Sequence, residues 1–352
     1  MALRHLLISS VPAFLACAAG PAEPARVEAA SPSETSLPSS FRWSSTGPLV
    51  VPVEDETHSF HAVKDPSFVF FDGRFHLFAT TASEKGGWSM LHSSFARFED
   101  AASARPYHFG DHPAFKGYHC APQVFYFRPQ KKWYLIFQSG QPQYSTTDDI
   151  TKPESWSAPR DFFNGVPSAV ANDAGAGNWL DFWVICDEAR CHLFFTNDDG
   201  SLFRSSTAIE RFPSGFSEPV VALRGTRESL YEASATYRVK GERRFLTLVE
   251  AMGPQGQRYF RSFVSETLEG EWSALADSWE NPFAGAKNVA FASGASWTED
   301  VSHGELVRDG YDETLTIDPK DLHFLYQGVD PARRNVPYFE LPYRLALLTP
   351  TK

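Results

Sequence analysis

The segment His61–Phe78, with the sequence HAVKDPSFVFFDGRFHLF, decides the fold. It contains a carboxylate, Asp65, followed by an apolar run, an Asp72-Gly73 pair and a second apolar run. An Asp-Gly pair between two runs of aromatic and β-branched residues is a strong short-range signal for a β-hairpin. The segment therefore predicts a hairpin whose first strand begins beside a carboxylate.

The same pattern recurs three more times along the chain. The flanking runs are QVFYF and WYLIF, then DFWVIC and CHLFF, then EASATYRV and RFLTLVEA. The four units start at Phe68, Val124, Phe182 and Ala233, so that successive starts lie 51 to 58 residues apart. Hairpins repeated at about this spacing are typical of propeller blades or a similar radial β array. With a fifth unit at GASWTED and the later strand LHFLYQG, the pattern predicts an all-β fold, a five-bladed β-propeller.

Three of the four clear hairpins carry an acid at or just before the first strand, namely Asp65, Asp181 and Glu232. In a propeller the first strand of each blade lines the central channel, so acids at matching positions converge at one end of the axis. A single acid in a chain with 43 acidic residues is normally a turn or strand-edge residue. Because these three occupy equivalent places in a repeat, we interpret them as a site.

The first 19 residues have the composition of an export signal. Arg4 and His5 precede an apolar stretch that ends in small residues and is too short for a permanent membrane-spanning helix. The sequence Ala16-Cys17-Ala18 fits a cleavage site, which predicts a signal peptide at residues 1–19 and a secreted, extracellular protein. Attachment of a lipid to Cys17 is the alternative, although the residues before it match that pattern less well.

Residues 20–40 and 41–352 differ in composition. The first region is rich in Pro, Ala, Ser and Glu and predicts a disordered linker. In the second region aromatic residues recur to the end, which indicates one globular domain. The net charge of −11, with no basic stripe, argues against nucleic acid or an anionic membrane as a partner. No feature indicates an obligate oligomer, and we expect a monomer without a transmembrane segment.

Cys186 and Cys191 flank the turn DEAR of one hairpin, close enough to pair across it in an oxidising compartment. Cys120 is then left over, and we expect it to be buried and free. A zinc site at these cysteines is not expected because they lack CxxC spacing. His303 lies in a polar segment, where a lone histidine is usually structural, and a metal-holding role is the alternative.

Longer stretches of the chain resemble a known family. They are LVVPVEDETHSFHAVKDPSFVFFDGRFHLFATTA, LYEAS, LVEAMGPQGQRYFRSF, ENPFAG, SGASWTEDVSHGELVRDGYDETLTIDPKDLHFLYQG and LPYRLALLT. From about Ser40 to Thr349 the chain resembles glycoside hydrolase family 62, the α-L-arabinofuranosidases. The resemblance implies that residues 41–352 are a catalytic five-bladed propeller, in agreement with the repeat. It also implies release of arabinose from arabinoxylan, or from arabinoxylo-oligosaccharides, with inversion.

The resemblance implies a role for each acid. Asp65, in KDPS, matches the general base that activates water, and Glu232, in LYEAS, matches the general acid. Asp181, in WLDFW, matches the acid that orients the proton donor and tunes its pKa. Hydrolysis of a glycosidic bond needs two such carboxyl groups, one protonated and one ionised, and a third acid raises the pKa of the donor by repulsion.

The resemblance also implies binding residues. Lys64, Arg261 and Tyr338 fall where the family contacts the arabinose or the adjoining xylan. Lys64, Arg258 and Arg261 could bond sugar hydroxyls or fix the acids, but position alone favours surface cations or structural ion pairs. His303 matches a histidine near a central ion, often calcium, so a structural Ca²⁺ is the implied cofactor, with no organic cofactor.

Three departures from the family pattern concern the substrate surface. This chain has Ser139 where the family has a tryptophan, Ala235 where it has a glutamine, and Phe339 where it has an asparagine. Arabinofuranoside cleavage is therefore a firmer expectation than arabinoxylan as the preferred polymer.

Two alternatives remain open. A related propeller glycosidase, of β-xylosidase or arabinanase type, would use the same three carboxylates, but the long C-terminal stretches favour family 62. A non-catalytic carbohydrate-binding propeller is the other alternative, and the presence of both Asp65 and Glu232 argues against it.

Overall fold

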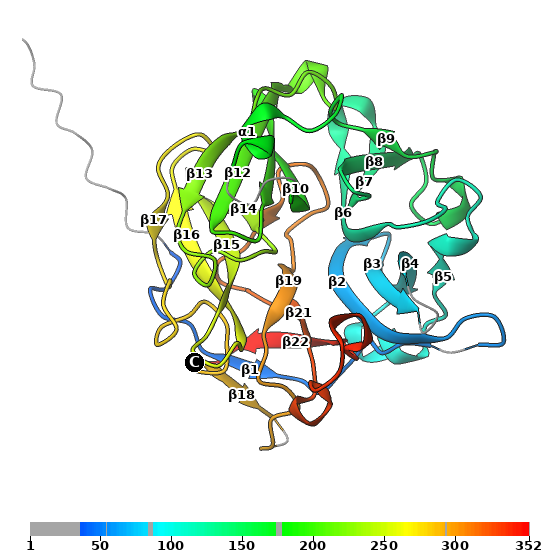
Figure 1. The fold of residues 1–352 in the computed structure, drawn as a ribbon, viewed down its shortest axis with the longest axis vertical. Coiled ribbons are helices and arrows are strands. Elements are labelled where there is room, and N and C mark those ends of the chain that lie inside the picture. Colours follow the sequence, from blue (N-terminus) through cyan, green and yellow to red (C-terminus); the bar gives the residue numbers. More distant parts are fainter. Residues whose placement is uncertain (1–35, 54, 84–86, 174–177, 293, 352) are drawn as a thin grey trace, which may run out of the picture. The chain divides into compact units, whose positions relative to one another are not determined.

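The computed structural model describes residues 36–53, 55–83, 87–173, 178–292 and 294–351. The predicted signal peptide, and the predicted linker up to residue 35, lie outside these ranges. The described part of the chain forms five β-sheets arranged around a central axis (Figure 1). Its one α-helix, α1 (Ser168–Ala171), has four residues, and no described helix is long and apolar enough to span a membrane. The prediction of a five-bladed β-propeller is confirmed.

Three blades consist of four consecutive antiparallel strands. The first contains β2 (Phe60–Phe71), β3 (Arg74–Ser83), β4 (Trp88–Phe95) and β5 (Tyr107–His108). The second contains β6 (Cys120–Phe127), β7 (Lys132–Gln138), β8 (Pro142–Thr147) and β9 (Arg160–Asp161). The third contains β10 (Leu180–Cys186), β11 (Arg190–Thr196), β12 (Ser201–Ala208) and β13 (Val220–Arg224).

The other two blades each gain a strand from elsewhere in the chain. The fourth contains β14 (Ala235–Val239), β15 (Phe245–Met252), β16 (Arg258–Ser265) and β17 (Ser273–Ala274), with β20 (Thr316–Ile317) parallel to β14. The fifth contains β19 (Ser302–Leu306), β21 (Phe324–Gly328), β22 (Arg344–Pro350), β1 (Trp43–Ser45) and β18 (Val289–Phe291). Because β1 pairs with β22, the N-terminal strand completes the last blade and closes the ring.

Short 3-10 helices connect several strands. They are η1 (Phe98–Ser103), η2 (Phe109–Asp111), η3 (Arg128–Gln130), η4 (Pro153–Ser155), η5 (Ile209–Arg211), η6 (Pro331–Arg333) and η7 (Tyr338–Glu340).

The four predicted hairpins are β2–β3, β6–β7, β10–β11 and β14–β15. The expected fifth unit begins later than predicted, because GASWTED precedes the inner strand β19 instead of forming it. In this segment the Thr298 hydroxyl accepts hydrogen bonds from the N–H groups of Asp300 and Val329, which bends the backbone away from an extended conformation.

One segment, residues 308–317, lies across one end of the central channel. This is the end at which the inner strands finish. The segment bonds to the inner strands of four blades. The bonds join Arg308 to the carbonyls of Phe68 and Val124, and they join the N–H groups of Tyr126, Cys186 and Arg238 to the carbonyls of Tyr311, Glu313 and Leu315. The beginnings of the inner strands therefore form the end of the channel that this segment leaves open.

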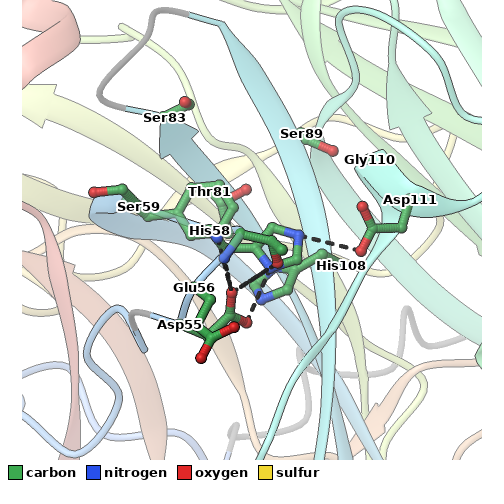
Figure 2. A pocket seen from close by; sticks show the side chains of 12 residues that line it. Asp55, Glu56, His58, Ser59, Thr81, Ser83, Ser89, His108, Gly110 and Asp111 are labelled. Carbon is green, nitrogen blue, oxygen red and sulfur yellow. Dashed lines mark hydrogen bonds and ion pairs between the residues drawn. The ribbon is translucent and has the colours of Figure 1, made fainter.

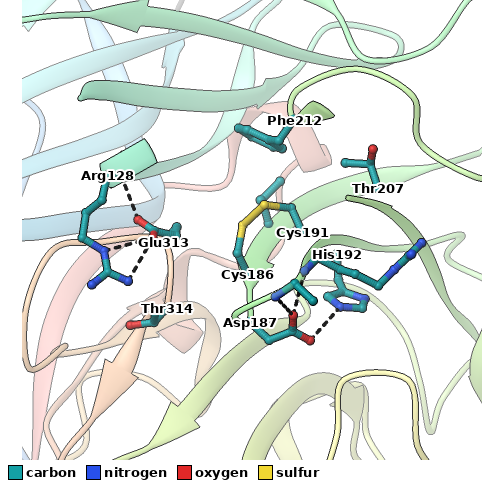
Figure 3. Close-up of a disulfide and its surroundings, with 12 residues drawn as sticks. Arg128, Cys186, Asp187, Cys191, His192, Thr207, Phe212, Glu313 and Thr314 are labelled. Carbon is teal, nitrogen blue, oxygen red and sulfur yellow. Dashed lines mark hydrogen bonds and ion pairs between the residues drawn. A yellow bond between two sulfur atoms is a disulfide. The ribbon is translucent and has the colours of Figure 1, made fainter. Parts of the chain in front are cut away.

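Cys186 and Cys191 face each other across the β10–β11 hairpin, with Cα atoms 4.0 Å apart, and form a disulfide (Figure 3). Cys120 is buried and free among the described residues, as expected.

We expect the Cys186→Ala/Cys191→Ala double variant to lose about 2 kcal/mol of unfolding free energy. The loss is modest because the disulfide closes only a small loop of the unfolded chain. Urea denaturation measures this loss. Peptide mapping provides the check on the bond itself. Alkylation of both thiols in the unreduced wild-type protein would contradict it.

Candidate active site

A cavity of about 260 Å³ opens where the inner strands begin. Every blade contributes to its wall from its first strand or from the few residues before that strand. The five contributions are Asp65, Ala121, Asp181, Glu232 and His303. The structure thus brings together the three acids that the sequence placed at equivalent points of the repeat.

A repeated backbone irregularity aims these side chains into the cavity. Four residues at this level adopt a left-handed conformation, Asp65 (φ 50°), Ala121 (φ 49°), Asp181 (φ 57°) and Ala233 (φ 53°). The first three coincide with β-bulges in β2, β6 and β10. A bulge redirects a side chain, and a left-handed residue other than glycine costs roughly 1–2 kcal/mol, so the surroundings must hold it in place.

Each irregularity is held by the preceding blade. At this level every blade has a backbone N–H group that donates to a side chain of the blade before it, at 2.6–3.3 Å. The five pairs are Asp65 with Gln327, Ala121 with Thr80, Asp181 with Gln138, Ala233 with Asp181 and His303 with Glu250. We call this set the inter-blade ring. It fixes the backbone beneath the acids from outside their own sheets.

Asp65 is buried, with 3% of its surface exposed, and lies between two bases. Its Oδ1 is 3.6 Å from Lys64 Nζ and 3.2 Å from His303 Nδ1. Burial opposes the charge of Lys64, but the Asp65 carboxylate raises the pKa of that ammonium well above its usual value. Lys64 is therefore cationic, and its charge lies beside the carboxyl group of Asp65.

Asp181 and Glu232 are two further acids of the cavity wall, and the charge of Glu232 acts on Asp181. Burial, then the charges of Glu232 and Asp65, raise the pKa of Asp181 well above its usual value. Burial also raises the pKa of Glu232, against the nearby guanidinium of Arg258. Because Asp181 Oδ2 accepts the Ala233 N–H at 2.9 Å, it orients the backbone next to Glu232. A raised pKa favours the protonated form of a carboxyl group, which is the form that can donate a proton.

Arg258 links Glu232 to a deeper carboxylate. Its NH1 lies 3.2 Å from Glu232 Oε1 and 2.9 Å from Glu250 Oε1, and its guanidinium stacks on the Tyr231 ring at 4.1 Å. Burial raises the pKa of Glu250 to about 8, with Arg258 opposing that rise. Glu250 also accepts hydrogen bonds from Ser302 Oγ and the His303 N–H. Arg258 is thus a positioning residue for Glu232.

Replacing Arg258 with methionine should move the basic limb of the pH profile of kcat/KM upward by about one unit, because the cation lowers the pKa of Glu232. The basic limb records the loss of the acid's proton, so a higher pKa keeps the enzyme active at higher pH. Arg261→Met, three residues along the same strand, is the control and should leave the limb in place. A limb that moves downward in Arg258→Met would contradict the assignment.

The predicted binding residues differ in where they lie. Lys64 and Tyr338 line the cavity, and Lys64 Nζ donates to the Tyr338 hydroxyl at 3.2 Å. Arg261 does not line it. Its guanidinium bonds to the Asp277 carboxylate at 2.9 Å and the Ser229 carbonyl at 2.7 Å, which is a structural arrangement. The structure therefore does not bring Arg261 together with the other site residues, and its contact with substrate stays a prediction.

His303 offers little to a calcium ion. Its Nδ1 is within 4.0 Å of one oxygen each of Asp65 and Asp181, whereas Ca²⁺ takes about six to eight oxygen ligands. The nearby Glu250 carboxylate already has three partners in Arg258, Ser302 and the His303 N–H. The donors described here do not fit the ion, and a calcium at His303 stays a prediction.

Sequence reasoning missed two side chains of the cavity wall. Asp198 follows β11 with φ 60°, and burial raises its pKa. Its Oδ1 is buried without a hydrogen-bond partner among the described residues. The turn Asp198-Asp199-Gly200 was a usable signal, because it ends a strand at the same edge as Asp181. Trp88 places its ring 4.5 Å from Lys64 Nζ, and no local pattern marked it.

Comparisons with known proteins agree with this geometry. α-L-Arabinofuranosidase C of Cellvibrio japonicus (strain Ueda107) is 41% identical over 321 residues, which is 90% of this chain and 48% of that protein. The chain thus spans about half the length of that curated relative. The catalytic domain of the Coprinopsis cinerea GH62 α-L-arabinofuranosidase is 49% identical, with a TM-score of 0.86 over 90% of this chain and 98% of that one.

A GH62 hydrolase in complex with xylotriose is similar as well, with 45% identity and a TM-score of 0.85 over 89% of this chain and 98% of that one. The family model for glycosyl hydrolase family 62 matches residues 42–349, nearly the whole propeller. The chain therefore belongs to glycosyl hydrolase family 62.

Proposed function

We propose that this protein is an α-L-arabinofuranosidase that removes arabinose side chains from arabinoxylan by an inverting mechanism. The observation that carries the proposal is a single cavity lined by two carboxyl groups, those of Asp65 and Glu232, whose electrostatic partners differ. Asp65 is paired with the cation of Lys64, while Glu232 belongs to an acidic pair whose pKa values are raised. Paired carboxyl groups of this kind are the apparatus of glycoside hydrolysis.

In the proposed reaction Glu232 donates its proton to the leaving glycosidic oxygen as the bond to the anomeric carbon breaks. Asp65 takes a proton from the water that attacks that carbon from the opposite face. Inversion requires the two carboxyl groups to stand roughly 6.5–9.5 Å apart, which leaves room for this water. Asp181 and Arg258 keep Glu232 in position through the Ala233 N–H and the Oε1 contact.

An aromatic rim beside the cavity supports a xylan chain as the carrier of the arabinose. Tyr118, Tyr338 and Phe339 are exposed, and the Phe339 ring lies 5.5 Å from that of Trp88. Aromatic faces stack on the apolar faces of sugar rings. The solved complex of a related hydrolase with xylotriose also favours a xylose backbone. Ser139 and Phe339 alter this rim relative to the family pattern.

The test is one-dimensional proton NMR of the protein with wheat arabinoxylan, read at early times, with Asp65→Ala as control. Free arabinose should appear first as the inverted β anomer and only with the wild-type protein. Early α anomer would overturn inversion, and free xylose would favour a xylosidase. If arabinose is released only from arabinan or arabinogalactan, the polymer assignment is wrong and the activity class stands.

We also propose that the protein is secreted. The composition of residues 1–19 supports this, and so does the Cys186–Cys191 disulfide, because disulfides persist in oxidising compartments. Mass spectrometry of the N-terminus of the exported protein distinguishes cleavage of a signal peptide from attachment of a lipid. A free amine after residue 18 or 19 indicates cleavage, and an acylated Cys17 indicates a lipid anchor.

A further inference from the structure

A second cavity, of about 380 Å³, lies on the first blade (Figure 2). It shares no lining residue with the active-site cavity. Two histidines and two aspartates meet there, from the segment before β2 and from β5 and η2. They are Asp55, His58, His108 and Asp111. None of them has a role in the reaction derived above.

His58 is held at both ring nitrogens. Its Nδ1 lies 3.0 Å from the Asp55 carboxylate, and its Nε2 lies 3.1 Å from Asp111 Oδ2. A histidine that binds a metal through one nitrogen usually gives its other N–H to a carboxylate, which fixes the ring. Asp111 occupies that second position. Two donors bound to one ion are also about 3 Å apart, so the Asp55–His58 spacing already suits a shared ligand.

His108 provides the independent observation. It is 6% exposed, and neither of its ring nitrogens has a hydrogen-bond partner among the described residues. Buried polar groups nearly always have partners, so an exception requires an explanation. The ring stacks on that of His58 with centroids 4.0 Å apart. A neutral imidazole has one ring nitrogen with a free lone pair, which is the atom that binds a metal.

We propose that Asp55, His58 and His108 bind a divalent transition-metal ion of the zinc type, with Asp111 orienting His58. One ligand atom from each of the three residues lies within 4.8 Å of the other two. Zinc at about 2.0–2.1 Å from each nitrogen holds its ligand atoms about 3.3 Å apart. Binding at that separation requires the His108 ring to rotate out of its stack with His58. Two imidazoles and one carboxylate suit zinc, whereas calcium and magnesium prefer oxygen ligands.

The bound ion would tie the two edges of the first blade together. Asp55 and His58 precede β2, the inner strand that carries Lys64 and Asp65, whereas His108 lies in β5, the outermost strand. An ion that binds only the folded arrangement raises stability by mass action. The expected effect is therefore on thermal stability, and the reaction does not require the ion.

The test is zinc titration of the purified, tag-free protein by calorimetry, together with thermal unfolding with and without zinc. The wild type should bind one equivalent, with Tm raised by at least about 2 °C at saturation. His108→Phe preserves the ring packing and should remove both effects. It should also leave the Tm of the metal-free protein unchanged or higher, since it removes two unpartnered nitrogens. Asp111→Asn should weaken binding by about 10- to 100-fold.

Two control variants separate this site from other donors. His323 pairs with Asp321 at 3.1 Å on another blade without a third ligand, so His323→Ala should bind zinc as the wild type does. His303→Ala should also retain zinc binding, which excludes the active-site cavity. The proposal is overturned if zinc does not bind, or if His108→Phe binds zinc as tightly as the wild type.

Discussion

We expect Asp65→Ala to lower kcat on arabinoxylan by roughly 1,000- to 10,000-fold, because the attacking water would lose the group that we propose takes its proton. The protein stays folded for a reason visible in the structure. Asp65 adopts a left-handed conformation (φ 50°), and Ala121 and Ala233 adopt the same conformation at the matching points of the second and fourth blades. Alanine is therefore compatible with this backbone.

Initial rates from reducing-sugar release, together with thermal unfolding, check this result. The matched control is Asp72→Asn, which changes an acid with the same φ of 50° at the outer turn of the same hairpin and should leave kcat unchanged. Retention of more than a few per cent of wild-type activity in Asp65→Ala would refute the base assignment. A large fall in Tm would show that loss of the partner of Lys64 had disturbed the fold.

We expect Glu232→Gln to lower kcat/KM on arabinoxylan by roughly 1,000-fold, but by less than about tenfold on an aryl arabinofuranoside with a good leaving group. A phenolate leaves without a proton, whereas a xylose hydroxyl needs one. Glutamine has the shape of glutamate and still accepts a hydrogen bond from Arg258, so the geometry of the site is preserved. The variant should also lose the basic limb of the pH profile, since that limb records deprotonation of Glu232.

Parallel kinetics on the two substrates between pH 4 and pH 9 measure both effects. Equal losses on the natural and the activated substrate would count against Glu232 as the proton donor. A basic limb that survives in Glu232→Gln would assign the titrating proton to Asp181 instead.

The sequence predicted those features that local chemistry determines. The Asp72-Gly73 turn and the alternating strands beside it are specified by neighbouring residues, so the hairpins and the three acids were found. The closing strand β1 was not predicted from the sequence. Its three residues carry no periodic signal, and its partner β22 lies about 300 residues away. Pairing over such a separation depends on the whole ring.

The two arginines of QRYFR show a second limit of sequence reasoning. Arg258 and Arg261 are three residues apart on β16, so their side chains point to opposite faces of the sheet. The motif does not reveal which face lines the channel. The pairing of Arg258 with Met252 and of Arg261 with Val249 settles it, and Arg258 reaches Glu232 while Arg261 reaches Asp277.

The inter-blade ring has a consequence for folding kinetics. A single blade can form its hairpins from local contacts, yet the backbone beneath each acid is fixed only when the preceding blade has docked. Asp65 in particular depends on Gln327, a residue of the blade that β1 completes. The active site is therefore complete only after β1 has paired with β22 and closed the ring, which is the slow long-range step of folding. Recovery of activity during refolding should lag behind recovery of β-structure.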